Sequence, residues 1–187
     1  MSGLDGKVVW VGGISRANDV GRAVALLLAS RGASVLVTGT EERVVGACVG
    51  EIAHGGGRAR HAVADAETPE GAALAIGAAV ERFGALDIAV VVVASPTRSA
   101  PAWERAALSL RPGGRFVVIA PADATADAFP RVAASAAEAE RRSATFNLLV
   151  TSAGAESEPA AECVRFLCSP AGRSVSGSVI VLKRHAD

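Results

Sequence analysis

The 187-residue chain contains no tyrosine and only two lysines, Lys7 and Lys183. No reaction of this chain can therefore use a tyrosine hydroxyl as general acid, because a general acid must exist before it can reach its proton. Excess charge of either sign is also missing, since 19 Lys and Arg side chains balance 19 Asp and Glu. A duplex-binding protein needs a cationic field to neutralise phosphates, so we expect no nucleic-acid partner. The longest apolar run, Ile88–Ala94, is too short to cross a bilayer, and we expect no membrane span.

Cysteine is scarce, with three residues, and the N-terminus has no charged segment followed by an apolar stretch. This pattern is typical of reduced thiols in a cytoplasmic protein without a signal peptide. None of the three histidines has a partner at metal-ligand spacing, and Cys163 and Cys168 lie five residues apart in a predicted helix, so we expect no metal site. We interpret these two cysteines as core and groove residues rather than nucleophiles.

What the chain has in abundance is apolar surface, with 50% hydrophobic residues and a mean hydropathy of +0.35 at zero net charge. Without self-repulsion, such a composition favours an oligomer or a subunit. The length favours one domain, residues 1–187.

Apolar β-branched runs alternate with alanine-rich amphipathic stretches along the chain. The run Asp87–Ala94 has no polar alternation, which is typical of a strand buried on both faces of a parallel sheet. Seven strands alternating with six helices predict a doubly wound, Rossmann-like α/β fold with helices on both faces. The predicted strands are Lys7–Val11, Ser34–Thr38, Arg60–Ala64, Asp87–Ala94, Arg115–Ala120, Phe146–Val150 and Val179–Leu182. The predicted helices are Val20–Ser30, Glu41–His54, Pro69–Phe83 with Thr68 as N-cap, Ala102–Leu110, Asp127–Ser143, and Glu158–Cys168 with Ser157 as N-cap.

A glycine-containing loop joins the first strand to the first helix, from Gly12 to Gly21. Glycines at such a turn allow the backbone to approach a pyrophosphate at a helix N-terminus. Asp19 stands where a dinucleotide site has its middle glycine, and we expect its carboxylate near that phosphate position. The loop equally fits an ordinary turn in which Asn18 or Asp19 caps the helix.

Five segments, taken in order, resemble the short-chain dehydrogenase/reductase family. They are Gly6–Ala25, Val63–Ala66, Val80–Asp87, Gly113–Ile119 and Ser157–Gly177. The resemblance covers nearly the whole chain and implies a fold that binds a nicotinamide dinucleotide. It implies vestigial cofactor-binding positions at Gly13, Asn18, Gly21 and Asp65. Asp65 would lie near adenine, or it would simply cap the end of its strand.

The residues that carry the family's chemistry have no counterparts at the matching positions. Val132 stands in place of the family's tyrosine and Ala136 in place of its lysine, while Ala120-Pro121 stand where a serine is expected. Val91–Ala94 replace the Asn-Asn-Ala-Gly motif. We therefore predict no catalytic residues and no cofactor bound by this chain.

Compared with the family that it resembles, the chain is shorter in two regions. Between Ala94 and Ile119 there are 24 residues, about half the interval that the resemblance implies, and six residues separate Val150 from Ser157 where a substrate-covering loop is expected. A reductase without that cover would have little pocket from which to exclude water.

In contrast, the segments of this chain that match the family's assembly surfaces resemble complete ones. Family members associate through the helices after strands four and five and through the last helix with the last strand. The interface residues that the resemblance implies are Val132, Ala136, Ala139, Phe166, Val179, Val181, Lys183 and Arg184. Lys183 and Arg184 would meet acidic groups of a partner or coenzyme A phosphates, or they would form a frayed tail.

The leading hypothesis is a non-catalytic subunit that pairs, as a heterotetramer, with an active short-chain dehydrogenase holding NAD. The resemblance extends to two-subunit members that act on a 2-(hydroxybenzyl)succinyl-CoA-type thioester in aromatic hydrocarbon catabolism. The alternative is a stand-alone nucleotide-binding regulatory protein of the same fold.

Overall fold

The computed structural model describes residues 3–16, 19–122, 128–152 and 156–183. Seven parallel strands form one sheet in the order β3-β2-β1-β4-β5-β6-β7. The strand order reverses between β1 and β4, where ligands bind in open α/β sheets. The fold class predicted from the sequence is confirmed. The strands are β1 Val8–Gly12, β2 Ser34–Gly39, β3 Arg58–Val63, β4 Ile88–Val92, β5 Arg115–Pro121, β6 Thr145–Thr151 and β7 Val179–Leu182.

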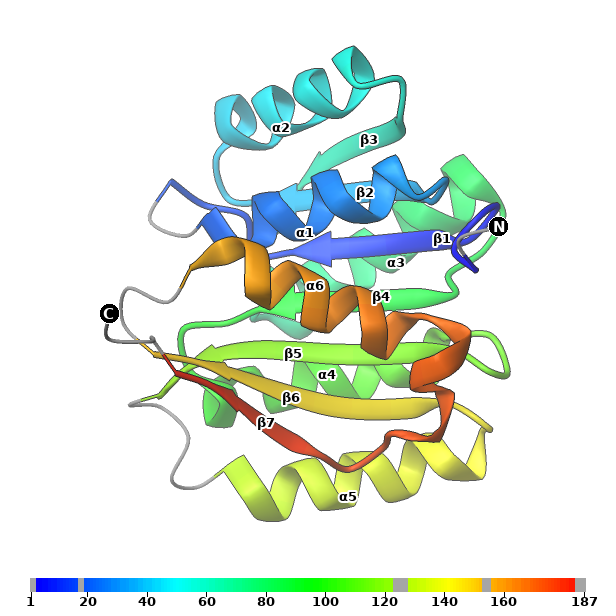
Figure 1. Ribbon diagram of the computed structural model, residues 1–187, viewed down its shortest axis with the longest axis vertical. Coiled ribbons are helices and arrows are strands. Elements are labelled where there is room, and N and C mark those ends of the chain that lie inside the picture. Colours follow the sequence, from blue (N-terminus) through cyan, green and yellow to red (C-terminus); the bar gives the residue numbers. More distant parts are fainter. Residues whose placement is uncertain (1–2, 17–18, 123–127, 153–155, 184–187) are drawn as a thin grey trace.

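Helices cover both faces of the sheet (Figure 1). One face carries α1 Asp19–Ser30, α2 Glu42–His54 and α6 Ser157–Cys168, and the other carries α3 Pro69–Phe83, α4 Pro96–Ser109 and α5 Ala128–Arg141. A 3₁₀ turn, Pro170–Ser174, follows α6. Within the described residues, no helix has the length and apolarity needed to cross a membrane.

Three helix starts test the sequence prediction. Thr68 caps α3 as predicted, because its Oγ1 accepts a hydrogen bond from the Gly71 N–H at 3.1 Å. Helix α4 begins at Pro96, six residues before the predicted start, because a proline fits the first helical position and Pro101 is accommodated inside the helix. Ser157 is the first residue of α6 rather than its cap; the N-cap is Glu156, whose side chain makes no capping bond.

Alternating strand residues supply two hydrophobic cores, one on each face. Val9 and Val11 of β1 pack toward α1, α2 and α6, whereas Trp10 packs toward α3 and α4. The indole N–H of Trp10 donates to Thr38 Oγ1 at 2.8 Å, which satisfies both groups inside the sheet.

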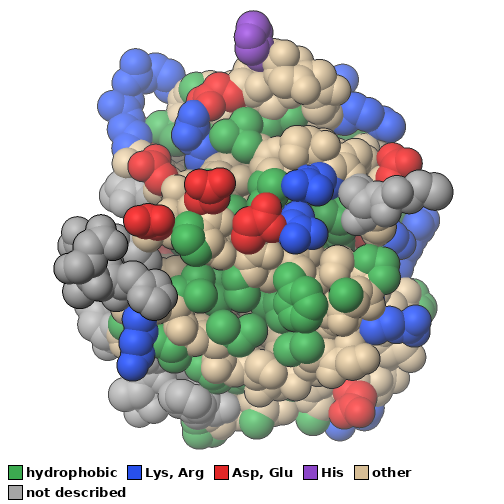
Figure 2. Space-filling model, viewed as in Figure 1, with side chains coloured by type: hydrophobic (Ala, Val, Ile, Leu, Met, Phe, Trp, Pro, Cys, Tyr) green, Lys and Arg blue, Asp and Glu red, His purple; other side chains and the backbone are tan. Residues whose placement is uncertain are grey.

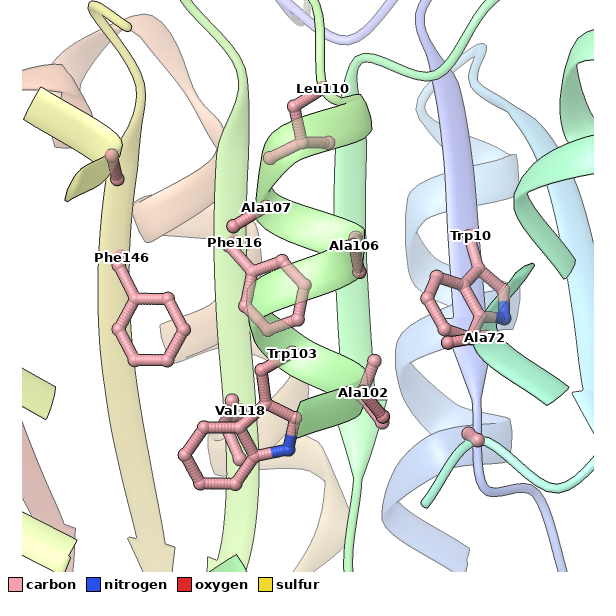
Figure 3. Packing of buried hydrophobic residues seen from close by; sticks show 14 of the residues in the cluster. Trp10, Ala72, Ala102, Trp103, Ala106, Ala107, Leu110, Phe116, Val118 and Phe146 are labelled. Carbon is pink, nitrogen blue, oxygen red and sulfur yellow. The ribbon is translucent and has the colours of Figure 1, made fainter. Parts of the chain in front are cut away.

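An aromatic cluster lies beneath α4, in the core between the sheet and helices α3, α4 and α5 (Figure 3). The rings of Phe116 and Phe146 stack with centroids 5.1 Å apart, and Trp103 of α4 lies 5.9 Å from Phe146. This cluster packs α4 against the amino-terminal parts of β5 and β6, at the opposite ends of these strands from the site.

The two edges of the sheet differ in chemistry. The β3 edge exposes Arg58 and Arg60, and His61 Nε2 lies 2.6 Å from Glu42 Oε1 of α2. Strand β7 is apolar throughout, and Val181 is 50% exposed. Charged side chains protect an edge strand from pairing with another chain, and β7 has none.

Candidate functional site

A cleft of about 330 Å³ runs along the carboxyl ends of the strands, at the side of the sheet toward which the arrows point in Figure 1. It crosses the point where the strand order reverses, the usual place for a ligand in this architecture. The turns after β1, β2 and β3 form one half, and the ends of β4, β5 and β6 form the other. Its lining residues are Gly13, Ile14, Ser15, Gly39, Thr40, Ala64, Asp65, Ala66, Glu67, Val92, Val93, Ala94, Ile119, Ala120, Pro121 and Thr151.

Two glycines of the cleft are fixed by close backbone packing. Gly13 has φ +79°, and a Cβ there would stand 2.0 Å from the carbonyl oxygen of Val92. A Cβ on Gly39 would stand 2.2 Å from the carbonyl oxygen of Ile14. The turn after β1 is thus held against β4 and β2, and its glycines are required by the fold itself, with or without a ligand.

Asp19 lies beside the cleft rather than in its lining. It is the exposed first residue of α1, the helix end at which we expect the phosphate position, and it lines an adjoining groove of about 270 Å³ together with Arg16, Arg22 and Arg43. A carboxylate at that position complements the positive end of the helix dipole. The buried Gly21 lies in the same helix, and the predicted cofactor residue Asn18 lies outside the described residues.

Asp65 lines the cleft and also caps the end of its strand. Its Oδ1 accepts a hydrogen bond from the Glu67 N–H at 2.9 Å, and its carbonyl oxygen accepts one from the Thr68 N–H at 3.2 Å. The capping alternative is therefore observed, and it leaves the Asp65 side chain exposed at the cleft.

Glu67 is a site residue that sequence reasoning missed. Its carboxylate binds the backbone N–H of Ala94 at 3.0 Å and the hydroxyl of Ser99 at 2.8 Å, and it is 15% exposed. These partners lie 27 and 32 residues along the chain, so no local sequence pattern signals the contact.

Among the described residues, the second half of the cleft has no ionisable side chain. Ala94, Ala120 and Pro121 line it, and the Thr151 hydroxyl is the polar side chain at this end. Over the entire described lining, the ionisable side chains are the two carboxylates of Asp65 and Glu67, with no lysine, arginine, histidine or cysteine.

Three residues assigned to an interface from the sequence belong to the core of this chain. Val132 and Ala139 are each 1% exposed and Ala136 is 8% exposed, and all three pack from α5 against the sheet. Their side chains are unavailable to a partner, and neither Val132 nor Ala136 lines the cleft. The assignment of these three residues to an interface is wrong, because their spacing marks the face of α5 that covers β6.

The remaining predicted interface residues differ in exposure. Phe166 is 43% exposed and Val179 is partly buried, while Lys183 is exposed after β7. Arg184 lies outside the described residues. We define the α6–β7 surface as Phe166, Val179, Ile180, Val181 and Leu182. Figure 2 shows hydrophobic side chains gathered on the face of the molecule over α6 and toward β7.

The cysteines are poor nucleophiles. Burial raises the pKa of Cys48 to about 11 and that of Cys168 to about 12, and burial also raises the pKa of Cys163. Thiols with raised pKa values stay protonated near neutral pH and react slowly. This agrees with their interpretation as packing residues.

The family model described as short chain dehydrogenase matches residues 7–107. The chain belongs to the short-chain dehydrogenase family. The match spans β1 through most of α4, which includes the first half of the cleft. The comparison with curated proteins gives no match.

Solved structures with the same fold cover almost the whole chain. A short-chain dehydrogenase/reductase from Serratia marcescens is 22% identical, with a TM-score of 0.84, over 96% of this chain and 97% of its own. A hydroxysteroid dehydrogenase from Escherichia coli is 20% identical, with a TM-score of 0.84, over 97% and 96%. A blue fluorescent protein from a metagenomic library, in complex with NADPH, is 22% identical, with a TM-score of 0.81, over 97% and 98%.

Proposed function

We propose that this short-chain dehydrogenase chain is a non-catalytic, cytoplasmic subunit that associates with a catalytically complete member of its family. One observation carries the proposal: the chain has no tyrosine, and Val132, at the position matched to that residue, is buried in the core away from the cleft. A proton-transferring group must lie within hydrogen-bond reach of the reacting atom, and no described lining side chain at the β4–β6 end is suited to that role.

The lining does not fit a nicotinamide dinucleotide used for hydride transfer. The charged side chains of the described lining are the carboxylates of Asp65 and Glu67, and this lining holds no cation that would pair with a pyrophosphate. Ala120, Pro121 and Ala94 offer no side-chain donor that would orient a nicotinamide ring. NAD would be held by the partner, and no step of the reaction is assigned to this chain.

Association through the α6–β7 surface is supported by its exposed apolar side chains. Isolated exposed apolar residues are ordinary, but Phe166 and Val181 adjoin an unprotected sheet edge. The segment that leads into β7 is anchored by the buried Asn147 side chain of β6. This side chain donates to the Val175 carbonyl at 2.8 Å and accepts from the Ser178 N–H at 3.1 Å. A rigid apolar edge is suited to continuous burial against another chain.

We propose that the partner's substrate is a 2-(hydroxybenzyl)succinyl-CoA-type thioester, which would make the complex a 2-[hydroxy(phenyl)methyl]succinyl-CoA dehydrogenase of aromatic hydrocarbon catabolism. The support is the resemblance to two-subunit family members in which one chain lacks the catalytic residues.

A second candidate function, a stand-alone nucleotide-binding regulator, is favoured by the first half of the cleft. Gly13, Gly39 and Asp65 keep a narrow pocket at the ends of β1, β2 and β3. Calorimetric titration of the purified chain with NAD, NADP and AMP separates the two candidates. Millimolar or weaker binding of all three supports the subunit. Micromolar binding of any of them supports the regulator and contradicts the prediction that this chain binds no cofactor.

The subunit itself is tested with a catalytically complete paralogue, for example one encoded beside this gene. We expect the isolated chain to show no turnover, and we expect the paralogue's activity to rise or to survive heating better when the chain is added. A paralogue whose stability, KM and kcat are all unchanged by an excess of this chain would contradict the proposal.

A further inference from the structure

The cleft offers a ligand few free hydrogen-bond donors. Backbone N–H groups of its lining already donate to acceptors of the chain itself, at 2.9 to 3.0 Å, in Ile14, Ala64, Glu67, Val93 and Ala94. The described lining has no lysine, arginine or histidine, and the adjoining start of α1 carries the Asp19 carboxylate, which offsets the partial positive charge of that helix end. Phosphate and carboxylate groups only accept hydrogen bonds and are poorly suited to such a site.

Asp65 holds the uncompensated negative charge of the cleft. The other carboxylate of the described lining, Glu67, lies 2.8 Å from Ser99 Oγ and 3.6 Å from the Arg98 guanidinium. Asp65 Oδ1 accepts a hydrogen bond from the Glu67 N–H, whereas within the described residues Asp65 Oδ2 makes no hydrogen bond or ion pair. The Asp65 side chain is exposed at the cleft, so Oδ2 is open to a cationic group of a ligand.

The two halves of the cleft differ in polarity. Asp65 shares its half with the hydroxyls of Ser15 and Thr40, which can accept further hydrogen bonds. The wall of the other half, at the ends of β4 and β5, is formed by Val92, Val93, Ile119, Ala120 and Pro121. An ammonium group carries donors only, and an apolar body is stabilised when it leaves water for such a wall. A small organic cation combines both features.

We propose that the cleft binds a small primary amine, whose ammonium group pairs with Asp65 and whose apolar body lies against the ends of β4 and β5. The charge of this ligand is opposite in sign to that of a dinucleotide. The inference goes beyond the proposed function, since it concerns the chain alone and holds with or without a catalytic partner.

Three probes of similar size test the charge selectivity of the cleft. Benzylamine, benzyl alcohol and benzoate share a ring and are positively charged, neutral and negatively charged at pH 7. In NMR titrations of the full chain at low salt, benzylamine should bind at least about fivefold more tightly than the other two probes. A factor of five corresponds to about 1 kcal/mol, the order of an exposed ion pair. The amide shifts that change should be those of the cleft lining, such as Ser15, Thr40 and Ala120.

Asp65→Asn locates the cationic group of the ligand. An asparagine keeps an oxygen for the Glu67 N–H and removes the charge, so the affinity for benzylamine should fall at least about fivefold, while that for benzyl alcohol should stay the same. Glu70→Gln is the matched control, because it removes one charge from the exposed first turn of α3, outside the described lining of the cleft. Its affinity for all three probes should equal that of the natural chain.

Three results would overturn the proposal. They are benzoate binding as tightly as benzylamine, no benzylamine binding up to about 20 mM, and equal effects of Asp65→Asn and Glu70→Gln on benzylamine affinity. Shift changes confined to residues outside the cleft lining would also contradict it. The comparison of the three probes uses the natural chain, so it decides the charge selectivity even if Asp65→Asn does not fold.

Discussion

The two edges of the sheet differ in the charge that they carry. Strand β3 exposes Arg58 and Arg60 as well as Val63 at its end and is bordered by α2, whereas β7 is a four-residue apolar strand with Val181 half exposed. Edge strands of soluble proteins are protected by charge, by bulges or by cover, because an open edge invites pairing. The contrast indicates that the β3 edge faces water and that the β7 edge is suited to another protein surface.

The largest expected effect comes from placing a charge on the apolar edge. Val181→Glu should weaken association with the catalytic partner by at least about 100-fold, because a carboxylate buried in an interface without a counter-charge costs roughly 3 kcal/mol or more. Leu74→Glu is the control, since Leu74 is similarly exposed, at 49%, but lies on α3. Equal loss of affinity in both variants, measured by titration calorimetry, would show that the β7 edge has no special role.

Asn147→Ala should loosen β7 from inside. The variant leaves the Val175 carbonyl and the Ser178 N–H without their buried partner, which should lower the free energy of unfolding by about 2–4 kcal/mol. Ser152→Ala removes a more accessible bond, from Ser152 Oγ to the Leu182 carbonyl, and should cost less than about 1 kcal/mol. Urea unfolding of both variants provides the comparison; a smaller loss for Asn147→Ala than for Ser152→Ala would be inconsistent with this account.

Helix α5, which covers β6 beside this edge, gives an effect of similar size. The double variant Val132→Tyr with Ala136→Lys restores the residue types of a catalytic pair but should produce no turnover with NAD or NADP. Both side chains would enter a packed core and should cost about 1–3 kcal/mol each in stability. Detectable, cofactor-dependent reduction of a ketone by the folded variant would contradict the buried position of these residues.

The smallest effect is a difference in cysteine labelling. Cys163 of α6 is partly buried, while Cys168 is buried and its pKa is raised to about 12. A raised pKa keeps the thiol protonated below that value, so alkylation should quicken as pH rises, with Cys163 labelled before Cys168. Association through the α6–β7 surface should slow Cys163 labelling several-fold. A Cys163 rate that is identical in the free and associated chain would place the contact elsewhere.

Most of the fold could be predicted from local sequence. Runs such as IAVVV in β4 have no polar alternation because both faces are buried, and the Thr68-Pro69 pair marks the start of α3 through a cap and a fixed φ. The early start of α4 was missed because Pro101 resembles a break, although the fold tolerates it within the helix.

The site was less predictable, for two physical reasons. Small and apolar residues at Val132, Ala136 and Ala139 share one helix face, and the pattern does not say whether the chain's own sheet or a partner covers that face. The Glu67 contacts join the end of β3 to the start of α4, which the fold brings together and the sequence separates. Asp65, at a strand end, was recognisable because capping and cleft exposure both follow from its place after β3.

The central claim is that this chain functions by association rather than by catalysis. The most direct test is sedimentation velocity of the purified chain alone, then mixed with a catalytically complete paralogue. We predict a self-associated or unstable chain alone and, in the mixture, a single heteromeric species with the mass of two chains of each kind. A well-behaved monomer whose sedimentation is unchanged by the paralogue at concentrations up to about 100 μM, far above the Kd of a stable interface, would contradict the account.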